Sequence, residues 1–137
     1  MPIPLQEIGL SVKRLQMRHH LAANKALAEL GITIVQWDAL RHLHQKPDAS
    51  LHELAQLTFQ TDQSFGTLAA RMIDRGLIER VPGPGRAVKH RLTAKGDKVR
   101  AAGGAVMDQV LAHSFSTLTP AELEEFGTLI RRLLRNY

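Results

Sequence analysis

Residues 50–92 read SLHELAQLTFQTDQSFGTLAARMIDRGLIERVPGPGRAVKHRL, and this stretch decides the fold. Two short amphipathic segments come first, over 51–57 and 65–73, with apolar residues at helical spacing. Two strand-like segments follow over 77–81 and 87–92, and the Pro-Gly-Pro-Gly run between them is a turn sequence. This order of elements predicts a helix-turn-helix followed by a β-hairpin, or wing.

Long amphipathic helices are expected on both sides of this stretch. Apolar residues at alternating spacings of three and four mark 4–30 as one helix, which Gly31 ends. After the wing, Thr93 is expected to cap a further helix, and Thr119 followed by Pro120 is a strong start signal for the last one. The apolar surface of the first helix is too wide to be covered by packing against a single surface of the same chain. Part of it is therefore expected to pack against a second copy of the chain.

These elements predict a single domain over 1–137, mostly α-helical with a small β-wing. The winged helix-turn-helix is expected over 33–92. Residues 4–30 and 94–137 are the expected dimerisation helices, which flank that DNA-binding unit on either side.

The composition is that of a soluble globular protein, with 44% hydrophobic and 23% charged residues. A net charge of +5 and a pI near 10.1 favour a polyanionic partner, most commonly nucleic acid. The absence of cysteine excludes disulfides, cysteine-based zinc sites and thiol redox sensing. No apolar run approaches the roughly 18 residues of a membrane span, and no signal peptide is expected, so the predicted location is the cytoplasm.

Short polar side chains gather where the second helix of the helix-turn-helix begins. That end of the helix enters the major groove, where Gln bonds adenine and Ser or Thr bonds several base edges. An acid there is less expected because it faces phosphates, although a carboxylate can accept from cytosine N4. In an isolated helix, a polar surface of this kind more often faces only water. Its position directly before a wing favours DNA binding instead. The candidate residues are Thr61, Asp62, Gln63, Ser64, Thr67 and Arg71.

Basic side chains mark the wing as a second DNA contact. Arg86 directly follows the Pro/Gly turn, and Lys89 and Arg91 lie in the returning strand. A cation at the tip of a hairpin can enter a narrow minor groove, where the potential is most negative. Residues 61–91 hold six basic and three acidic side chains, so they carry +3 of the total charge of +5. The alternative, a solvated charged surface, is less favoured because the cations cluster on a groove-shaped element.

The histidines do not form a metal-binding pattern. His42 and His44 diverge on a helix, as do the adjacent His19 and His20, and no pair has the i, i+4 spacing of a helical zinc site. His19 falls within the apolar seam of the first helix, where a hydrogen-bonded core or interface histidine is expected. No nucleophile–base pair, carboxylate pair or phosphate loop supports catalysis, and no cofactor is expected.

Together these segments resemble the MarR (multiple antibiotic resistance regulator) family of winged-helix transcription regulators. The resemblance covers nearly the whole chain, and its segments occur in the family's order and spacing. They are ITIVQWDALRHL, LHELA, ARMIDRGLIER, HRLTAKG and LTPAELEEF.

The resemblance implies a homodimeric repressor on a palindromic double-stranded DNA operator. Each recognition helix would lie in a major groove and each wing in the flanking minor groove. Arg86 matches the family's wing arginine, but the acid that the family usually has two residues earlier is Pro84 here. The family also implies a small aromatic ligand that releases DNA, bound between the dimerisation and DNA-binding parts. The pocket residues carried over on this basis are His19, His20, Trp37 and Leu40.

Two other readings of the sequence remain open. One is a winged-helix protein-interaction module without DNA binding, which Asp62 and the missing wing acid at Pro84 would suit. The other is a small metal-responsive regulator. Salt-dependent binding to random duplex DNA separates the first alternative from a DNA-binding regulator, and sensitivity to a chelator tests the second.

Overall fold

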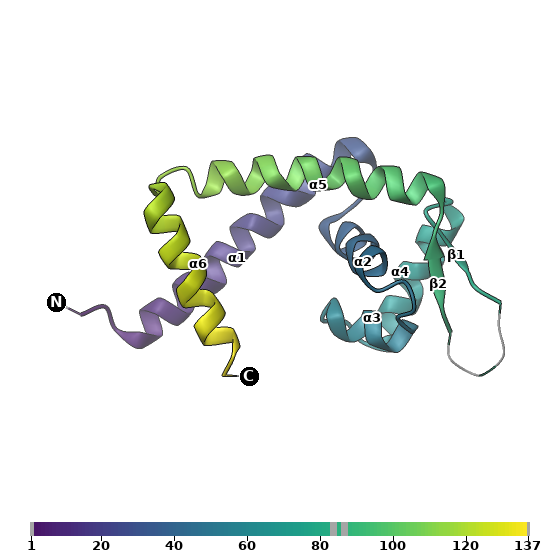
Figure 1. Ribbon diagram of the computed structural model, residues 1–137, viewed down its shortest axis with the longest axis horizontal. Helices are drawn as coiled ribbons and strands as arrows, with labels where there is room; N and C mark the ends of the chain where they lie inside the picture. Colours follow the sequence, from purple (N-terminus) through teal and green to yellow (C-terminus); the bar gives the residue numbers. More distant parts are fainter. Residues whose placement is uncertain (1, 83–84, 86–87, 137) are drawn as a thin grey trace.

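The computed structural model describes residues 2–82, 85 and 88–136 (Figure 1). Helix α5 spans the molecule and connects two parts. Helix α6 and the N-terminal part of α1 lie at one end, α2, α3, α4 and the two strands lie at the other, and the rest of α1 runs to α5 and on toward α2. The expected fold, mostly α-helical with a small β-wing, is confirmed. In chain order the elements are α1 Leu5–Leu27, η1 Ala28–Leu30, α2 Ile34–Gln45, α3 Leu51–Leu57, α4 Asp62–Asp74, β1 Ile78–Arg80, β2 His90–Leu92, α5 Ala94–Ser114 and α6 Pro120–Leu134.

Helices α2 to α6 each begin at a Ser or Thr cap, as the sequence predicts, whereas α1 has no side-chain cap and passes at Leu27 into the short helix η1. In three capping boxes a Ser or Thr side chain accepts from the backbone N–H three residues on, and a Glu or Gln side chain accepts from the cap's own N–H. Gly31 and Gly76, both at φ +73°, lie just beyond the ends of η1 and α4, in a conformation that disfavours other residues. The boxes pair Thr33 with Gln36, Ser50 with Glu53 and Thr119 with Glu122.

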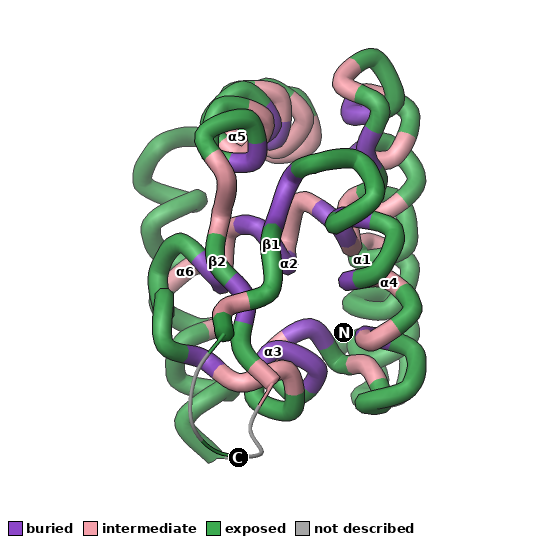
Figure 2. Tube along the Cα trace, turned by 90° about the vertical axis from the view of Figure 1, so that its right-hand side faces the viewer, coloured by how far each residue is buried: buried purple, intermediate pink, exposed green. Residues whose placement is uncertain are grey.

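The hydrophobic core lies mainly in the winged helix-turn-helix. Figure 2 shows buried stretches in α2, α3 and β1, whereas α6 is exposed along most of its length. None of the described residues of α6 is buried. The core therefore stabilises the winged helix-turn-helix from within, and much apolar surface on α1 and α6 stays uncovered in one chain. The largest fully buried side chains are Leu27, Leu40, Leu54, Phe65, Met72 and Leu77.

The two strands form an antiparallel hairpin, but they are shorter than predicted. The register pairs Ile78 with Leu92 and Arg80 with His90, and one more bond runs from Val81 N–H to the Lys89 carbonyl at 2.9 Å. Ile78 and His90 are each 3% exposed, so the hairpin packs on the core at its base. A two-stranded ribbon has little stability without such packing, which explains why the strands end early. Ala87, where the second strand was expected to begin, lies outside the described residues.

His90 makes folding stability depend on pH. Burial, and secondarily the positive charge of Arg80, lowers the pKa of His90 below its ordinary value of 6.5. Among the described residues its Nδ1 has no hydrogen-bond partner. Between the lowered pKa and 6.5 the unfolded chain binds more protons at this residue than the folded one. Its contribution to stability is therefore complete above pH 6.5 and falls as the pH drops through that window.

We expect His90→Gln to reduce the fall in unfolding free energy that occurs as the pH is lowered. Urea unfolding at pH 7 and pH 5 should give a smaller difference in unfolding free energy for the variant than for the wild type. His113→Gln, which alters an exposed imidazole in the last turn of α5, is the control and should keep the wild-type difference. Equal pH dependence in His90→Gln and wild type would contradict the assignment.

Candidate nucleic-acid interface

Helix α4 turns one surface to the core and the opposite one to solvent. Phe65, Ala69 and Met72 are buried. Because an α-helix repeats every 3.6 residues, Gln63 and Thr67 lie nearly opposite that buried stripe, and both are exposed. These two predicted residues therefore point most directly away from the protein.

The N-cap Thr61 and the predicted residues of α4 other than Asp62 line a groove on the α2 side of the helix. The groove has a volume of about 560 Å³. The Thr61 hydroxyl caps the helix by accepting from Ser64 N–H at 3.0 Å. The Thr67 hydroxyl donates to the Gln63 carbonyl at 3.2 Å, so its methyl and lone pairs remain for other contacts. The lining residues are Val35, Gln60, Thr61, Gln63, Ser64, Thr67, Leu68 and Arg71.

Asp62 lies on the other flank of α4, toward α3, and is paired with a residue that the sequence did not single out. His52 Nδ1 lies 2.8 Å from Oδ1 and 3.0 Å from Oδ2 of Asp62. Both side chains are exposed, at 63% and 59%. The two residues come from different helices and lie ten positions apart, so no helical spacing in the sequence could have revealed the pair.

The wing is attached to the start of α3. Leu51 N–H donates to the Val88 carbonyl at 2.8 Å, and Ser50 forms a β-bridge with Lys89. Lys89 is exposed, as expected for a phosphate contact. Across the hairpin Arg91 donates to Glu79 at 2.6 Å, which offsets the charge of Arg91. Arg86, the predicted minor-groove residue, lies outside the described residues, as does Pro84.

The four predicted pocket residues lie on two helices. On α1, His19 Nε2 lies 2.6 Å from the Ser114 hydroxyl and its ring meets Phe115 edge-on, with centroids 5.3 Å apart. The expected hydrogen-bonded His19 is thus confirmed, while His20 is half-buried. On α2, Trp37 donates from Nε1 to the Arg100 carbonyl at 3.1 Å. The fourth residue is Leu40, which is fully buried in the core.

His19 belongs to an apolar pocket between α1 and α6. Its volume is about 520 Å³, and its walls include Val12, Phe115 and Phe126. The Phe115 and Phe126 rings lie 6.1 Å apart. This pocket continues the uncovered apolar surface of α1 and α6, away from Leu40. The structure therefore separates His19 from Leu40 rather than bringing them into one site.

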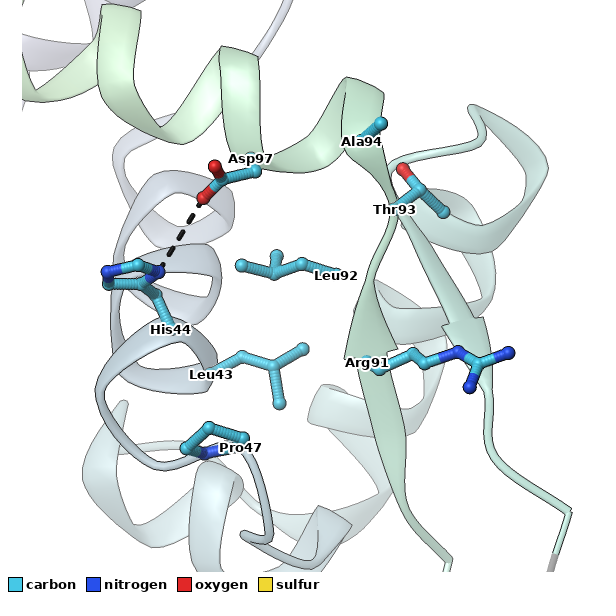
Figure 3. Close-up of a pocket in the computed structure, with 8 residues that line it drawn as sticks. All are labelled: Leu43, His44, Pro47, Arg91, Leu92, Thr93, Ala94 and Asp97. Carbon is cyan, nitrogen blue, oxygen red and sulfur yellow. Dashed lines mark ion pairs between the residues drawn. The ribbon is translucent and has the colours of Figure 1, made fainter.

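A second cavity, not expected from the sequence, lies where α2, β2 and the start of α5 meet (Figure 3). It has a volume of about 390 Å³. Leu43 and Leu92 face each other across it, and His44 Nδ1 lies 3.5 Å from Asp97 at its edge. Arg91 also borders the cavity but points away from its centre. The cavity thus has apolar walls and an exposed ion pair joining α2 to α5.

Neither a metal cluster nor a membrane span occurs within the described ranges. Among residues 2–82, 85 and 88–136, no three His, Asp or Glu side chains lie together in a group that could hold a metal ion. No helix in that part of the chain has the length and apolar character needed to cross a bilayer.

Sequence comparisons connect this fold to known regulators. The profile of the MarR family matches residues 30–87. The HTH-type transcriptional repressor Rv2887 of Mycobacterium tuberculosis is 31% identical over 110 residues, which span 79% of each chain. The transcriptional regulator HosA of Escherichia coli O111:H- is 31% identical over 107 residues, covering 75% of this chain and 78% of HosA.

Solved structures agree with this relationship. Apo MarR of E. coli superposes with a TM-score of 0.84 at 21% identity, over 98% of this chain and 99% of MarR, which establishes a common fold. Rv2887 in complex with DNA gives 0.80 at 27% identity, over 96% and 98% of the two chains. Rv2887 with salicylic acid gives 0.79 at 28%, over 96% and 97%. The fold and these relatives together establish that the chain belongs to the MarR family.

Proposed function

We propose that this chain is a dimeric transcriptional repressor that binds palindromic double-stranded DNA and is released by a small aromatic ligand. The observation that carries the proposal is the outward surface of α4, where Gln63 and Thr67 face solvent beside a basic wing. The name of Rv2887 as a repressor and its structure with DNA support the same function. Such a regulator would act in the cytoplasm and would catalyse no reaction.

In this proposal the first turns of α4 read base edges in the major groove. The Gln63 amide has the donor and acceptor needed to bond adenine at two positions, and the Thr67 methyl can pack on thymine. The flank of α4 nearer α2 would contact the sugar-phosphate backbone of the DNA and so fix the position of the helix in the groove. The residues on that flank are Thr61, Ser64 and Arg71. Because a homodimer presents two such helices, the half-sites should lie about 10 bp apart or a multiple of that distance.

The wing would supply contacts that depend on charge and groove width. Lys89 is exposed and would meet phosphate. From the sequence alone, we place Arg86 in the flanking minor groove, where a narrow A·T-rich segment concentrates negative potential. Lys89 would add affinity on all sequences and Arg86 most where the flanking segment is A·T-rich, whereas Gln63 would add affinity mainly on the preferred operator.

We expect Gln63→Ala to weaken binding to the preferred operator by about 1–3 kcal/mol and to have a much smaller effect on random DNA. The operator is first selected from a random duplex pool with the wild-type protein, and affinities are then measured at fixed salt. Lys89→Ala is the matched control, because loss of a phosphate contact should weaken both DNAs similarly and lower the salt dependence of binding. Equal losses on both DNAs in Gln63→Ala would show that Gln63 does not read bases.

Ligand release is proposed from the relatives and from the family resemblance. Rv2887 has been solved with salicylic acid and with p-aminosalicylic acid, which are small aromatic acids. Of the predicted residues His19, His20, Trp37 and Leu40, we propose His19 as the ligand contact, because it lines an apolar pocket beside Phe115 that the other three do not line. No bound cofactor is needed for this function.

A protein-interaction module without DNA binding is less well supported. Two features of the sequence favour it: the acid Asp62 at the end of α4 that would meet DNA, and the missing wing acid at Pro84, which lies outside the described residues. In the folded chain that carboxylate is engaged by His52 at 2.8 Å, so it does not present an unpaired negative charge to phosphate. DNA binding is therefore the function that the arrangement supports best.

A further inference from the structure

The His52–Asp62 pair joins the two helices of the helix-turn-helix at their solvent-facing side. His52 is the second residue of α3, and Asp62 is the first residue of α4. The single nitrogen Nδ1 lies within 3.0 Å of both carboxylate oxygens. Such a geometry has Nδ1–H as the donor and both oxygens as acceptors. The contact therefore fixes the direction of the Asp62 side chain as well as its position.

The direction of Asp62 matters because of its neighbours. It is the acidic residue of the first turn of α4, and Gln63 follows it directly. A carboxylate there interacts favourably with the helix dipole but would repel the phosphates that flank a major groove. Held toward α3, it lies to one side of the surface that carries Gln63 and Thr67.

The donor is held in place by the backbone around it. The Ser50–Glu53 capping box fixes the first turn of α3, and the Glu53 carboxylate accepts from Ser50 N–H at 3.3 Å. Leu51 N–H is bonded to the wing at Val88. The nearby acid Glu53 is thus already engaged in the cap, and His52 projects from a turn that is anchored on both sides.

We infer that His52 is a positioning residue for DNA recognition, which acts by holding the Asp62 carboxylate on the α3 side of α4 and away from phosphate. This inference rests on the proposed DNA-binding function. An exposed ion pair adds little to folding stability, so the role should appear in DNA affinity and not in resistance to denaturant.

The test is a double-mutant cycle on the wild-type-selected operator. His52→Ala should weaken binding about tenfold per dimer, since two carboxylates are released. His52→Asn should restore most of the affinity, because its side-chain NH₂ lies close to where Nδ1 was. In an Asp62→Asn background, His52→Ala should change affinity less than twofold. Urea unfolding should be the same for wild type and His52→Ala.

Three results would overturn the inference. An equal loss with and without the Asp62 carboxylate would mean that His52 contacts DNA itself. No loss in His52→Ala would mean that the pair has no role in recognition, and a loss that follows reduced stability would make the pair purely structural. If the proposed function itself is wrong, the result is different. The wild-type protein would then show no salt-dependent binding to any duplex in the pool.

Discussion

Gly96→Ala should destabilise the folded protein by about 3–5 kcal/mol, a large part of the roughly 5–15 kcal/mol that stabilises a typical domain. Gly96 is buried in the first turns of α5, and a Cβ atom there would collide with the backbone carbonyl oxygen of Leu77 and come within 2.8 Å of its carbonyl carbon. Backbone cannot turn aside as a flexible side chain can. The start of α5 would have to move away from the wing.

That movement would break contacts that fix α5 on the DNA-binding unit. The same Leu77 carbonyl accepts from Thr93 N–H and from the Thr93 hydroxyl, each at 3.1 Å. Thr93 is also the N-cap of α5, where its hydroxyl accepts from Gly96 N–H at 2.9 Å. Leu77 itself is fully buried. If α5 moved to avoid the collision, the hydrogen bonds from Thr93 to the Leu77 carbonyl would weaken. The N-cap of α5 would also be loosened.

Urea unfolding at fixed protein concentration measures the effect, since the stability of a dimer depends on concentration. Gly104→Ala is the matched control in the same helix. A Cβ at Gly104 would meet nothing within 4 Å, so the better helix propensity of alanine should add up to about 1 kcal/mol. A loss of less than about 1 kcal/mol in Gly96→Ala would show that α5 is not packed against Leu77 as described.

Local signals in the sequence were sufficient for the helices and for the direction of α4. The Thr33, Ser50 and Thr119 caps act within four residues, so their capping boxes follow from sequence spacing. The buried stripe of α4 likewise follows from helical periodicity, and it places Gln63 and Thr67 on the outer surface. These features needed no knowledge of which helices pack together.

Features that depend on packing between distant segments were not predictable in this way. The pairing of His52 with Asp62 requires the angle between α3 and α4. Only the fold shows that Gly103 packs against the Trp37 indole, where a Cβ atom would come within 2.9 Å of Nε1. Phe59 adopts φ 58°, a conformation that favours glycine, in the turn between the two helices. No rule of spacing places a phenylalanine there.

Deleting residues 120–137 should abolish the folded dimer and leave an unfolded or aggregated chain. None of the described residues of α6 is buried within one chain, so the effect of its loss should come from contacts with a partner chain. Much of its apolar surface and that of α1 is instead uncovered. Leu133 and Leu134 are 60% and 68% exposed, and Leu5 is 85% exposed. Such a large uncovered surface is expected where a second chain packs, and obligate dimers often have no stable folded monomer.

Sedimentation of the intact protein at micromolar concentration should give about 30 kDa, twice the 15.2 kDa of one chain.

A single substitution separates loss of the interface from loss of the helix. Leu133→Asp replaces a side chain that is already exposed in one protomer, so it should cost little unless a partner covers it. We expect it to shift the protein toward monomer or aggregate, whereas Glu125→Gln on the same helix should leave the dimer intact. A soluble, folded monomer in the wild type would refute the dimer, because the uncovered surface of α1 and α6 would then be stable in water. DNA binding would weaken together with dimerisation, since one protomer can occupy only one half-site of a palindrome.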